Sequence, residues 1–510
     1  MSIITTKADV LKTVKDKQLT YQQRVIAMAR ASERLFDPRE LLGYTDEDVM
    51  YLENNFICDL GEGFAFYRPR YVVPDYSVFV KNGSKYFELD PPKTIDDVLD
   101  GLLILYKSVP AEGALTVWVG HLDKLIEPFV TNEVEDYPKI KRFLNHIDKT
   151  IPSSFCHADI GPEDTKAGRM ILKASVELLN PTPNLTLKYD KDITPDDFLE
   201  LAAKTSLLAA KPNIANHKKY TKDLGNYAIV SCYNALLLGG GGYSLPRIRY
   251  GTVAASCNSL DEMLNDVFPK VIKSQLNMLD KKIDFTVEEA PFFKTHWLVK
   301  EGFIKQENFT GMVGMVGLAD AVNHFLKLEG LNETFGKSVR GDEIGMQLMQ
   351  LHNDMVEAHE TKYCAATNHR YLLHSQVGAK INDEDYRNTP GHRIKIGQEP
   401  DLADHMIQSA KFQDFFKAGT GDIFNFDQTY EKKPEAVVDV IKGLIDLDYR
   451  FFTTYMENQE LIRVTGYLAK RSEMEKYRNG EAVMRDTTFC ATGTDDIANI
   501  LDRKVRVDGK

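Results

Sequence analysis

Apolar residues recur at helical spacing in two segments of the N-terminal third. One runs from Leu19 to about Phe36 behind Thr20, and another begins behind Thr94 and continues through Tyr106. Because side chains three or four residues apart share one face of a helix, each run predicts an amphipathic helix packed on a core. We therefore expect this third of the chain to be substantially helical.

Short apolar runs alternate with further helical segments in the middle of the chain. Leu115–Val119 and Leu185–Tyr189 predict buried strands, and residues 194–210 predict a helix. This alternation favours an α/β architecture in which helices connect parallel strands. Long helices are also expected at residues 259–284, opened by a Ser259–Glu262 capping box, at 342–361 and at 434–452. Residues 362–430, interrupted by proline and glycine, are expected to form loops and strands.

Composition restricts the class of protein. The 510 residues are 43% hydrophobic and 27% charged, and 75 acidic residues against 63 basic ones give a net charge of -12. An acidic chain without basic blocks is a poor nucleic-acid binder, so a small-molecule substrate is the better expectation. No stretch approaches 18 apolar residues and no signal segment opens the chain, which predicts a cytoplasmic protein without membrane contact. Six scattered cysteines fit neither a disulfide scaffold nor a zinc ribbon.

One glycine near the C-terminus has a suggestive context. Gly466 lies in the sequence Arg463-Val464-Thr465-Gly466-Tyr467. A radical on a backbone Cα is stabilised when the amide nitrogen donates into it and the carbonyl withdraws from it, which requires a planar centre. Glycine flattens without a side-chain clash and tolerates unusual backbone angles. Gly466 is therefore a candidate for storing a radical, and the alternative is an ordinary glycine in a turn or bulge.

A stored radical needs a thiol that can carry it to a substrate. Cys232 follows the apolar run 227–230 and precedes Gly239–Gly242, which places it near the tip of a loop. Cys257 lies just before the capping box at Ser259, and the need for a small hydrophobic residue where a helix begins is enough to explain a cysteine there. Hydrogen-atom transfer does not require a lowered thiol pKa, unlike nucleophilic catalysis. We therefore favour Cys232, and the alternative is a buried structural thiol.

The segment 462–467 resembles the glycyl radical signature of pyruvate formate-lyase, glycyl radical eliminases and anaerobic ribonucleotide reductase. Over nearly its full length the chain resembles the YjjI-type glycyl radical proteins. The matching stretches are 57–76, 228–241, 298–323, 373–376, 389–401 and 463–467.

The resemblance implies an α/β fold, namely a ten-stranded glycyl radical enzyme barrel of two parallel five-stranded half-barrels surrounded by helices. Residues 1–455 would form this barrel, with a helical N-terminal part and the cysteine loop near residue 232. Residues 456–510 would form the C-terminal glycine radical segment. The glycine loop and the cysteine loop would then enter from opposite ends and meet inside.

Differences from better-known glycyl radical enzymes narrow the range of reactions that this chain could catalyse. Pyruvate formate-lyase uses two adjacent cysteines, whereas Tyr233 follows Cys232 here. The eliminases carry a glutamate base two residues after the cysteine, where this chain has Asn234, which takes up no proton. Residues 309–322 look most like anaerobic ribonucleotide reductase, but the chain lacks that enzyme's four-cysteine zinc site and its N-terminal regulatory domain.

Four polar residues match the family pattern and are candidates for the substrate pocket. They are Arg70, His374, Gln376 and Glu399. The alternative for each is a structural or surface role. Cys156-His157 and Cys364 with His369 have no second ligand pair at a suitable spacing, so no metal site is expected. The run Gly239–Gly242 lacks the Gly-Lys-Ser/Thr ending of a phosphate-binding loop.

The resemblance implies an anaerobic enzyme of lyase or reductase type with no permanently bound cofactor. A separate radical-SAM activating enzyme with an iron–sulfur cluster would install the radical on Gly466. Gly466 would then generate a thiyl radical on Cys232, which abstracts hydrogen from a small polar substrate. Family habit favours a homodimer. The alternatives are a ribonucleotide-reductase-like activity on a nucleoside or nucleotide, and a catalytically silent barrel that binds a ligand.

Overall fold

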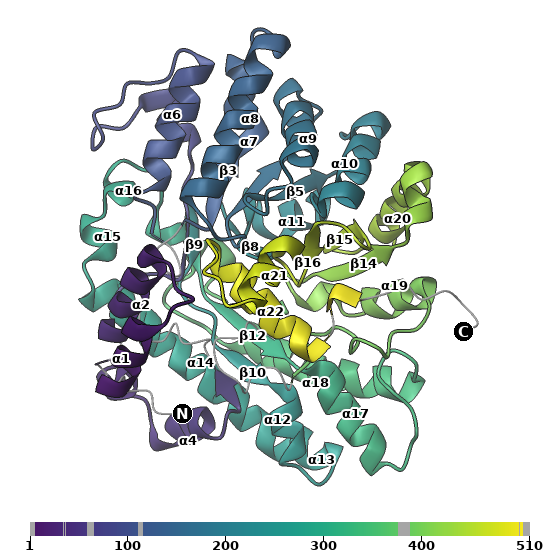
Figure 1. Ribbon diagram of the computed structural model, residues 1–510. Helices are drawn as coiled ribbons and strands as arrows, with labels where there is room; N and C mark the ends of the chain where they lie inside the picture. Colours follow the sequence, from purple (N-terminus) through teal and green to yellow (C-terminus); the bar gives the residue numbers. More distant parts are fainter. Residues whose placement is uncertain are drawn as a thin grey trace.

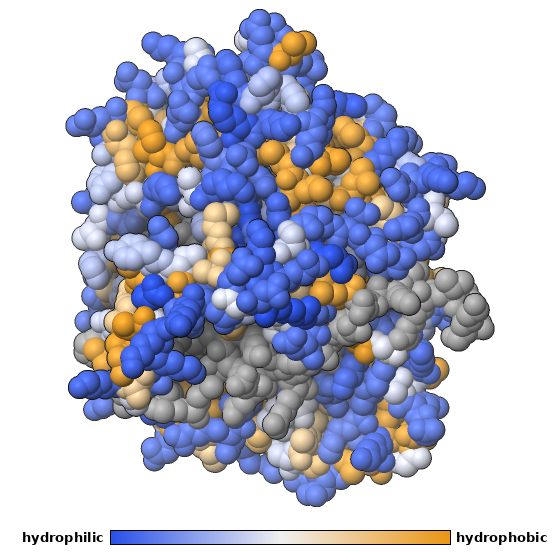
Figure 2. Space-filling view, viewed as in Figure 1, coloured by the Kyte–Doolittle hydropathy of each residue, from blue (hydrophilic) through white to orange (hydrophobic). Residues whose placement is uncertain are grey.

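The computed structural model describes residues 6–33, 35, 37–58, 66–110, 116–375, 388–498 and 500–502. Helices surround centrally placed strands, which confirms the expected α/β architecture (Figure 1). The face seen in Figure 1 is mostly hydrophilic, with separate apolar patches (Figure 2). Within the described ranges no helix combines the length and apolarity needed to span a membrane.

The larger sheet has six strands in the order β14-β15-β6-β5-β4-β3. Neighbours from β3 to β6 are parallel and almost wholly buried, as expected for strands covered on both faces. β15 is antiparallel to β6 and parallel to β14. The strands are β3 (Trp118–His121), β4 (His157–Ile160), β5 (Asn184–Tyr189), β6 (Asn213–Asn216), β14 (Asp422–Phe426) and β15 (Phe451–Met456). The helices between the parallel strands include α8 (Glu133–Thr150), α9 (Lys166–Leu178) and α10 (Asp196–Ala209).

A second sheet has four strands in the order β1-β10-β12-β13. They are β1 (Ile57–Cys58), β10 (Arg247–Arg249), β12 (Met312–Val316) and β13 (Leu372–Ser375). The last three are parallel, and their register aligns Arg247 with Gly314 and Gly314 with His374. The helices of this half are α12 (Tyr250–Ala255), α14 (Phe268–Asp284), α17 (Leu318–Leu328) and α18 (Val339–Ala358).

The two sheets approach each other beside β13. The Ala418 N–H donates to Leu373 O at 3.1 Å, and the Ser375 N–H donates to Gly419 O at 3.0 Å, so the chain leading into β14 runs along β13. Among the strands that the structure describes, none pairs β3 with the four-stranded sheet. Closure into a ten-stranded barrel therefore stays a prediction.

Two small sheets complete the interior. β7 (Tyr227–Val230) and β8 (Asn234–Leu237) form an antiparallel hairpin that carries Cys232 at its turn. β9 (Gly240–Gly242) pairs with β2 (Tyr71–Val73) and β11 (Phe309–Thr310). The glycine run is thus a tightly packed strand, because a Cβ on Gly240 would lie 2.0 Å from Asn308 O.

The C-terminal segment crosses the middle of the molecule between its two halves (Figure 1). It contains β16 (Leu461–Arg463), β17 (Leu468–Lys470), α21 (Arg471–Arg478) and α22 (Asp486–Ala498). Several of its buried apolar residues, among them Ile462, Tyr467 and Met474, form a cluster separate from the main core, whereas Leu461 and Leu468 cluster with Ala209, Ala210 and Tyr455. The boundary at residue 456 coincides with the end of β15, but the division into domains stays a prediction.

The sequence predicts the position of a helix well where the residues directly before the helix cap its N-terminus. The helix α2 (Tyr21–Glu33) is confirmed, and so is α6 (Ile95–Tyr106) with its Thr94 capping box. The expected helix at 342–361 begins three residues earlier, at Val339, behind the N-cap Ser338.

Three expectations about the C-terminal half need correction. The helix expected at 434–452 ends at Asp446, because Asp448 turns the chain with φ 62° and β15 follows. Residues 362–430 contain a helix, α19 (Leu402–Ala410), which Asp401 caps. Before α14, residues Met263–Val267 form a π turn. The expected capping box is incomplete, because the Glu262 carboxylate accepts from the Asn258 N–H and not from the Ser259 N–H.

Candidate active site

Gly466 lies against Cys232 in the protein interior. The Val464 N–H donates to Tyr467 O at 3.1 Å, so Gly466 is in a tight turn between β16 and β17. A Cβ built on Gly466 would lie only 2.2 Å from the Cβ of Cys232 and 2.6 Å from its Cα. The φ of Gly466 is not positive, so this close approach, rather than an unusual backbone angle, requires glycine. Glycine and cysteine, 234 positions apart in the sequence, are thus in direct contact.

The glycine loop is docked on the ends of strands β4 and β5. The Asn184 side-chain amide donates to Gly466 O at 2.7 Å, and its oxygen accepts from Arg463 Nη2 at 3.2 Å. The Ser154 hydroxyl donates to Leu468 O at 2.6 Å and accepts from the Leu468 N–H at 3.1 Å. These bonds satisfy backbone groups that would otherwise be buried without partners. They also fix the position of the Gly466 Cα relative to the sheet.

Arg463 is completely buried beside this loop. It also donates from Nη2 to Ala210 O, but its Nε and Nη1 atoms have no hydrogen-bond partner among the described residues. Burial lowers the pKa of Arg463 to about 9, so the guanidinium stays charged at neutral pH. A positive charge is therefore held beside Cys232 and Gly466.

His157 fixes the cysteine loop from β4, where it is the register partner of Asn184 on β5. Its Nδ1 donates to Ser231 O at 2.6 Å, and its Nε2 accepts from the Thr186 hydroxyl at 2.8 Å. Burial lowers the pKa of His157 to about 3, so the ring is neutral and has one donor and one acceptor nitrogen, as these bonds require. Ser231 has φ 58°, a conformation uncommon for residues with a side chain, and the bond from His157 helps to hold it. From the sequence, the only role considered for His157 is that of a metal ligand, and the lack of a second ligand pair argues against that role.

Tyr233 connects the cysteine hairpin to the four-stranded sheet. Its ring stacks on that of His374 with centroids 5.6 Å apart and an interplanar angle of 13°. The guanidinium carbon of Arg393 lies 5.7 Å from the centroid of the same ring. Tyr233 and His374 are fully buried, so the contact belongs to the interior beside Cys232.

The structure relates two of the four pocket candidates to each other. Burial, followed by the positive charges of Arg70 and Arg247, lowers the pKa of His374 well below its ordinary value, which means that both guanidiniums act on this ring. Glu399 lies in the loop before α19 and accepts from the Gly397 N–H at 2.7 Å. Gln376 lies outside the described residues. The roles of all four stay predictions.

Sequence reasoning missed several residues that shape the site, namely Asn184, His157, Arg247 and Ser154. Arg463 was visible in the glycine signature, but no local pattern distinguishes the others. Asn184 and His157 each begin a buried strand, and their partners are far away in the chain. Only the packing of the strands against the two loops reveals their contacts.

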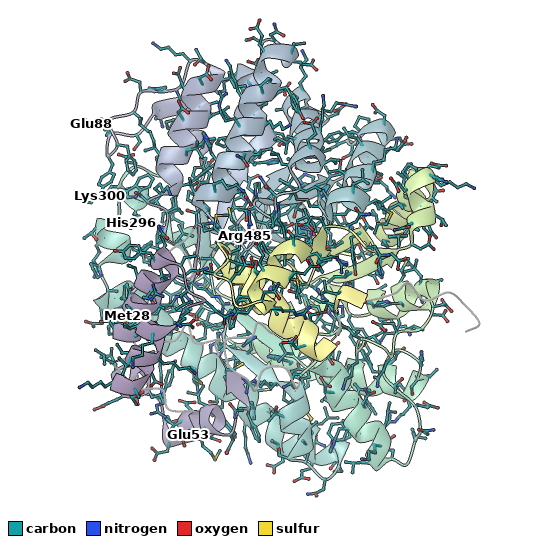
Figure 3. All side chains as sticks on the ribbon, in the orientation of Figure 1. Met28, Glu53, Glu88, His296, Lys300 and Arg485 are labelled. Atoms are coloured by element: carbon teal, nitrogen blue, oxygen red, sulfur yellow. The ribbon has the colours of Figure 1, made fainter. Side chains whose placement is uncertain are left out.

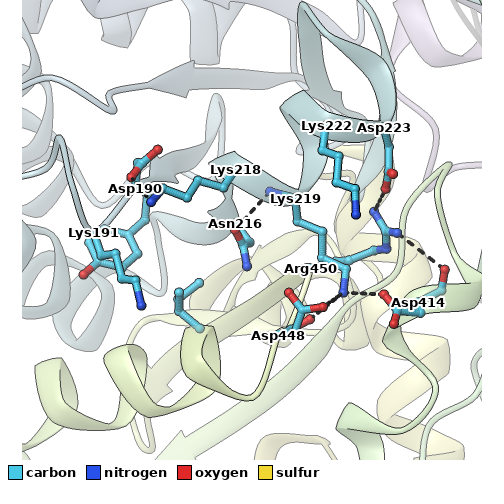
Figure 4. A pocket seen from close by; sticks show the side chains of 12 residues that line it. Asp190, Lys191, Asn216, Lys218, Lys219, Lys222, Asp223, Asp414, Asp448 and Arg450 are labelled. Carbon is cyan, nitrogen blue, oxygen red and sulfur yellow. Dashed lines mark hydrogen bonds and ion pairs between the residues drawn. The ribbon is translucent and has the colours of Figure 1, made fainter.

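A charged pocket of about 350 Å³ lies at the other ends of β5 and β6, beside Tyr189 and Asn216 (Figure 4). Its lining residues pair with one another, as in the ion pairs of Lys219 with Asp448 and of Arg450 with Asp223. It is thus separated from Gly466 by the length of the strands. In the part of the chain that the structure describes, no group of three or more His, Cys, Asp or Glu side chains could hold a metal ion.

Comparisons with known proteins match this chain over most of its length. A family profile described as "Glycyl radical enzyme YjjI-like" matches residues 19–506. An uncharacterized protein of Haemophilus influenzae is 57% identical over 499 residues, which cover 98% of this chain and 97% of the relative. The protein YjjI of Escherichia coli is 39% identical over 462 residues, 89% of this chain and 88% of the relative.

Solved structures show the same fold at low sequence identity. The anaerobic ribonucleotide reductase of Thermotoga maritima with glycerol in the active site matches with a TM-score of 0.71 at 13% identity, covering 94% of each chain. Hydroxyproline dehydratase of Clostridioides difficile, with trans-4-hydroxy-L-proline bound, matches with a TM-score of 0.62 at 12% identity, covering 94% of this chain and 89% of the other. The matched profile, the relatives and the shared fold together identify the chain as a member of the YjjI-like glycyl radical enzyme family.

Proposed function

We propose that Gly466 stores a radical on its Cα and that Cys232 carries it to the substrate. The observation that supports this most strongly is the contact between the two residues, in which a Cβ on Gly466 would lie 2.2 Å from the Cβ of Cys232. The Gly466 radical takes the hydrogen atom of the Cys232 thiol and leaves a thiyl radical. The thiyl radical takes a hydrogen atom from a substrate carbon, and the product radical takes it back after the reaction. The re-formed thiyl radical on Cys232 then takes a hydrogen atom from the Gly466 Cα, so Gly466 recovers its radical at the end of the cycle.

A radical-SAM activating enzyme with an iron–sulfur cluster is the proposed partner. This enzyme would remove one hydrogen atom from the Cα of Gly466. Gly466 is buried and packed on Cys232, so the C-terminal segment has to leave its docking site before a second protein can reach it. Part of the segment forms an apolar cluster of its own, whereas Leu461 and Leu468 pack with Ala209 and Ala210, so release of the segment would have to break these contacts.

The proposed reaction acts on a small polar substrate and is of lyase or reductase type. Tyr233 occupies the position of a second cysteine, which argues against acyl transfer. Asn234 is buried and its Oδ1 has no hydrogen-bond partner in the described part of the chain, so it offers a neutral acceptor two residues after Cys232. Any proton abstraction would need a base from another element.

We further propose that the four-stranded and six-stranded sheets belong to one ten-stranded barrel. The bonds from Ala418 to Leu373 and from Ser375 to Gly419 already connect them along one edge. The cysteine hairpin and the glycine loop would then meet inside this barrel.

Electron paramagnetic resonance tests the proposal directly. Anaerobic incubation with the cognate activating enzyme and an electron source should give a glycyl doublet, and Gly466→Ala should abolish it. The absence of a doublet would favour the alternative of a silent ligand-binding barrel, and a doublet that survives Gly466→Ala would show that the radical is not on Gly466. Air should cleave the activated chain at Gly466 and release a C-terminal fragment of about 45 residues.

A matched pair of cysteine variants tests the thiyl assignment. Cys232→Ser should keep the glycyl doublet and abolish turnover. Cys257 is also buried, but its thiol donates to Val253 O within the helix α12 region, so Cys257→Ser should keep both. The assignment to Cys232 is wrong if turnover is lost in Cys257→Ser and kept in Cys232→Ser.

A further inference from the structure

One face of the four-stranded sheet carries buried cationic side chains toward the cysteine hairpin. Arg247, Gly314 and His374 are aligned across neighbouring strands, so they point to the same face. A Cβ on Gly314 would lie 2.7 Å from the Cγ of Arg247, so the missing side chain gives Arg247 room to lie across β12. Arg249 follows two positions later on this face and is also buried.

Among the residues that the structure describes, none forms a hydrogen bond with the His374 ring. The side chain is completely buried, and within the described ranges both ring nitrogens lack a partner. A buried polar group without a partner is costly, and native proteins retain one mainly where a ligand or water completes it. The stacked ring of Tyr233, the neighbour of Cys232, places His374 next to the proposed thiyl site.

Arg70 lies close to the start of β10, because its Nη1 donates to Leu245 O at 3.4 Å, two residues before Arg247. With both arginines nearby, the electrostatic surroundings of His374 favour a negative charge. Burial and the positive charges of Arg70 and Arg247 together hold its pKa well below the ordinary value. The ring is therefore neutral at neutral pH and presents one N–H donor and one acceptor. Guanidinium groups match carboxylate and phosphate oxygens through paired hydrogen bonds.

We propose that Arg247, Arg70 and His374 bind an anionic group of the substrate, a carboxylate or a phosphate, beside Cys232. This inference rests on the proposed function for the statement that the bound molecule is the substrate. The anionic group would be held by the guanidiniums and would accept a hydrogen bond from His374. The rest of the molecule would extend along Tyr233 toward the thiol.

Calorimetric titration of the full-length, unactivated chain tests the anion site without the radical. The probes are glycerol 3-phosphate against glycerol, and glycolate against ethylene glycol, at constant ionic strength. Saturable binding of one anionic probe, at least about tenfold tighter than its neutral partner, is expected. Which anion binds distinguishes a phosphate site from a carboxylate site.

Variants separate a binding role from a structural one. Arg247→Met should weaken anion binding at least about tenfold, whereas Arg340→Met, at a partly exposed arginine paired with Glu329, should leave it unchanged. His374→Phe keeps the ring stacked on Tyr233 and removes two unpartnered nitrogens. It should therefore leave the melting temperature unchanged or raised while weakening anion binding, a combination that a structural role does not produce.

Two results would overturn the anion site: neutral probes that bind as tightly as their anionic partners, or no saturable binding of either anion at millimolar concentration. If a folded His374→Phe variant still binds the anion, His374 is not part of the anion site. This variant provides a test even if Arg247→Met does not fold. The glycyl radical test is independent, because anion binding without a doublet contradicts the proposed function alone. A doublet without anion binding contradicts only this inference.

Discussion

The side-chain amide of Asn184 donates a 2.7 Å hydrogen bond to the backbone carbonyl of Gly466. The bond polarises the carbonyl that withdraws electron density from the Cα. The same side chain accepts from Arg463, so a single residue at the start of β5 supports both the glycine and the cation beside it.

Asn184→Ala should therefore shorten the lifetime of the Gly466 radical and lower its yield. The carbonyl loses its donor and Arg463 loses one acceptor, so the free energy of unfolding should also fall by about 1–3 kcal/mol. Spin quantification and decay in anaerobic samples measure the first effect, and urea unfolding measures the second. Asn145→Ala is the control, because Asn145 accepts from Asn180 at a partly exposed site. An unchanged radical lifetime in Asn184→Ala would contradict the role of the bond.

Gly466→Ala should disturb the docking of the C-terminal segment in addition to removing the radical site. The new Cβ would meet the Cβ and Cα of Cys232 at 2.2 and 2.6 Å, and the backbone must shift to accommodate it. A cost of about 1–3 kcal/mol is expected, with faster amide exchange in β16, β17 and α21. Gly443→Ala is the matched control, because Gly443 lies in α20 (Pro434–Asp446) with nothing within 4 Å, and it should be neutral or stabilising. Equal effects would contradict the close approach.

The ion pair of Arg485 and Asp148 should stabilise the docked C-terminal segment. Figure 3 labels Arg485 on this segment, while Asp148 lies on α8; their side chains are 1% and 0% exposed. Arg485→Ala removes the buried ion-pair partner of the Asp148 carboxylate and leaves only the more exposed Lys149, so it should cost about 3–5 kcal/mol, with increased amide exchange in α21 and α22. Lys149 also pairs with Asp148 but is 49% exposed, so Lys149→Ala should cost less than about 1 kcal/mol. Similar values for both variants would show that burial does not determine the effect.

Stability should fall in acid partly because His157 is buried as a neutral ring. Its folded pKa of about 3 is below the unfolded value of about 6.5, so between these values the unfolded chain binds more protons. The free energy of unfolding therefore decreases as pH falls through this window, by at most about 1.4 kcal/mol per pH unit from this residue. His157→Gln should reduce that slope while lowering stability at pH 7, as urea unfolding at a series of pH values will show. His146→Gln, at an exposed histidine, should leave the slope unchanged, and an unaltered slope in His157→Gln would exclude this explanation.

Some features followed from local sequence. Periodicity and capping residues located α2 and α6, since the hydrogen bonds and caps of a helix come from neighbouring residues. The helix expected through Phe452 instead ended at Asp446, because strand pairing with β14 and β6 determined the conformation of β15. Periodicity carries no information about such distant partners.

The sequence by itself determined the chemical candidates, because the flanking residues identified Gly466 and the loop context favoured Cys232. The tertiary structure alone decided that the two touch, that Asn184 and His157 hold their loops, and that Arg247 is aligned with His374. Each of these relationships joins residues from different strands and loops. Their contacts depend on how the sheets pack and in which register, which no local pattern of residues specifies.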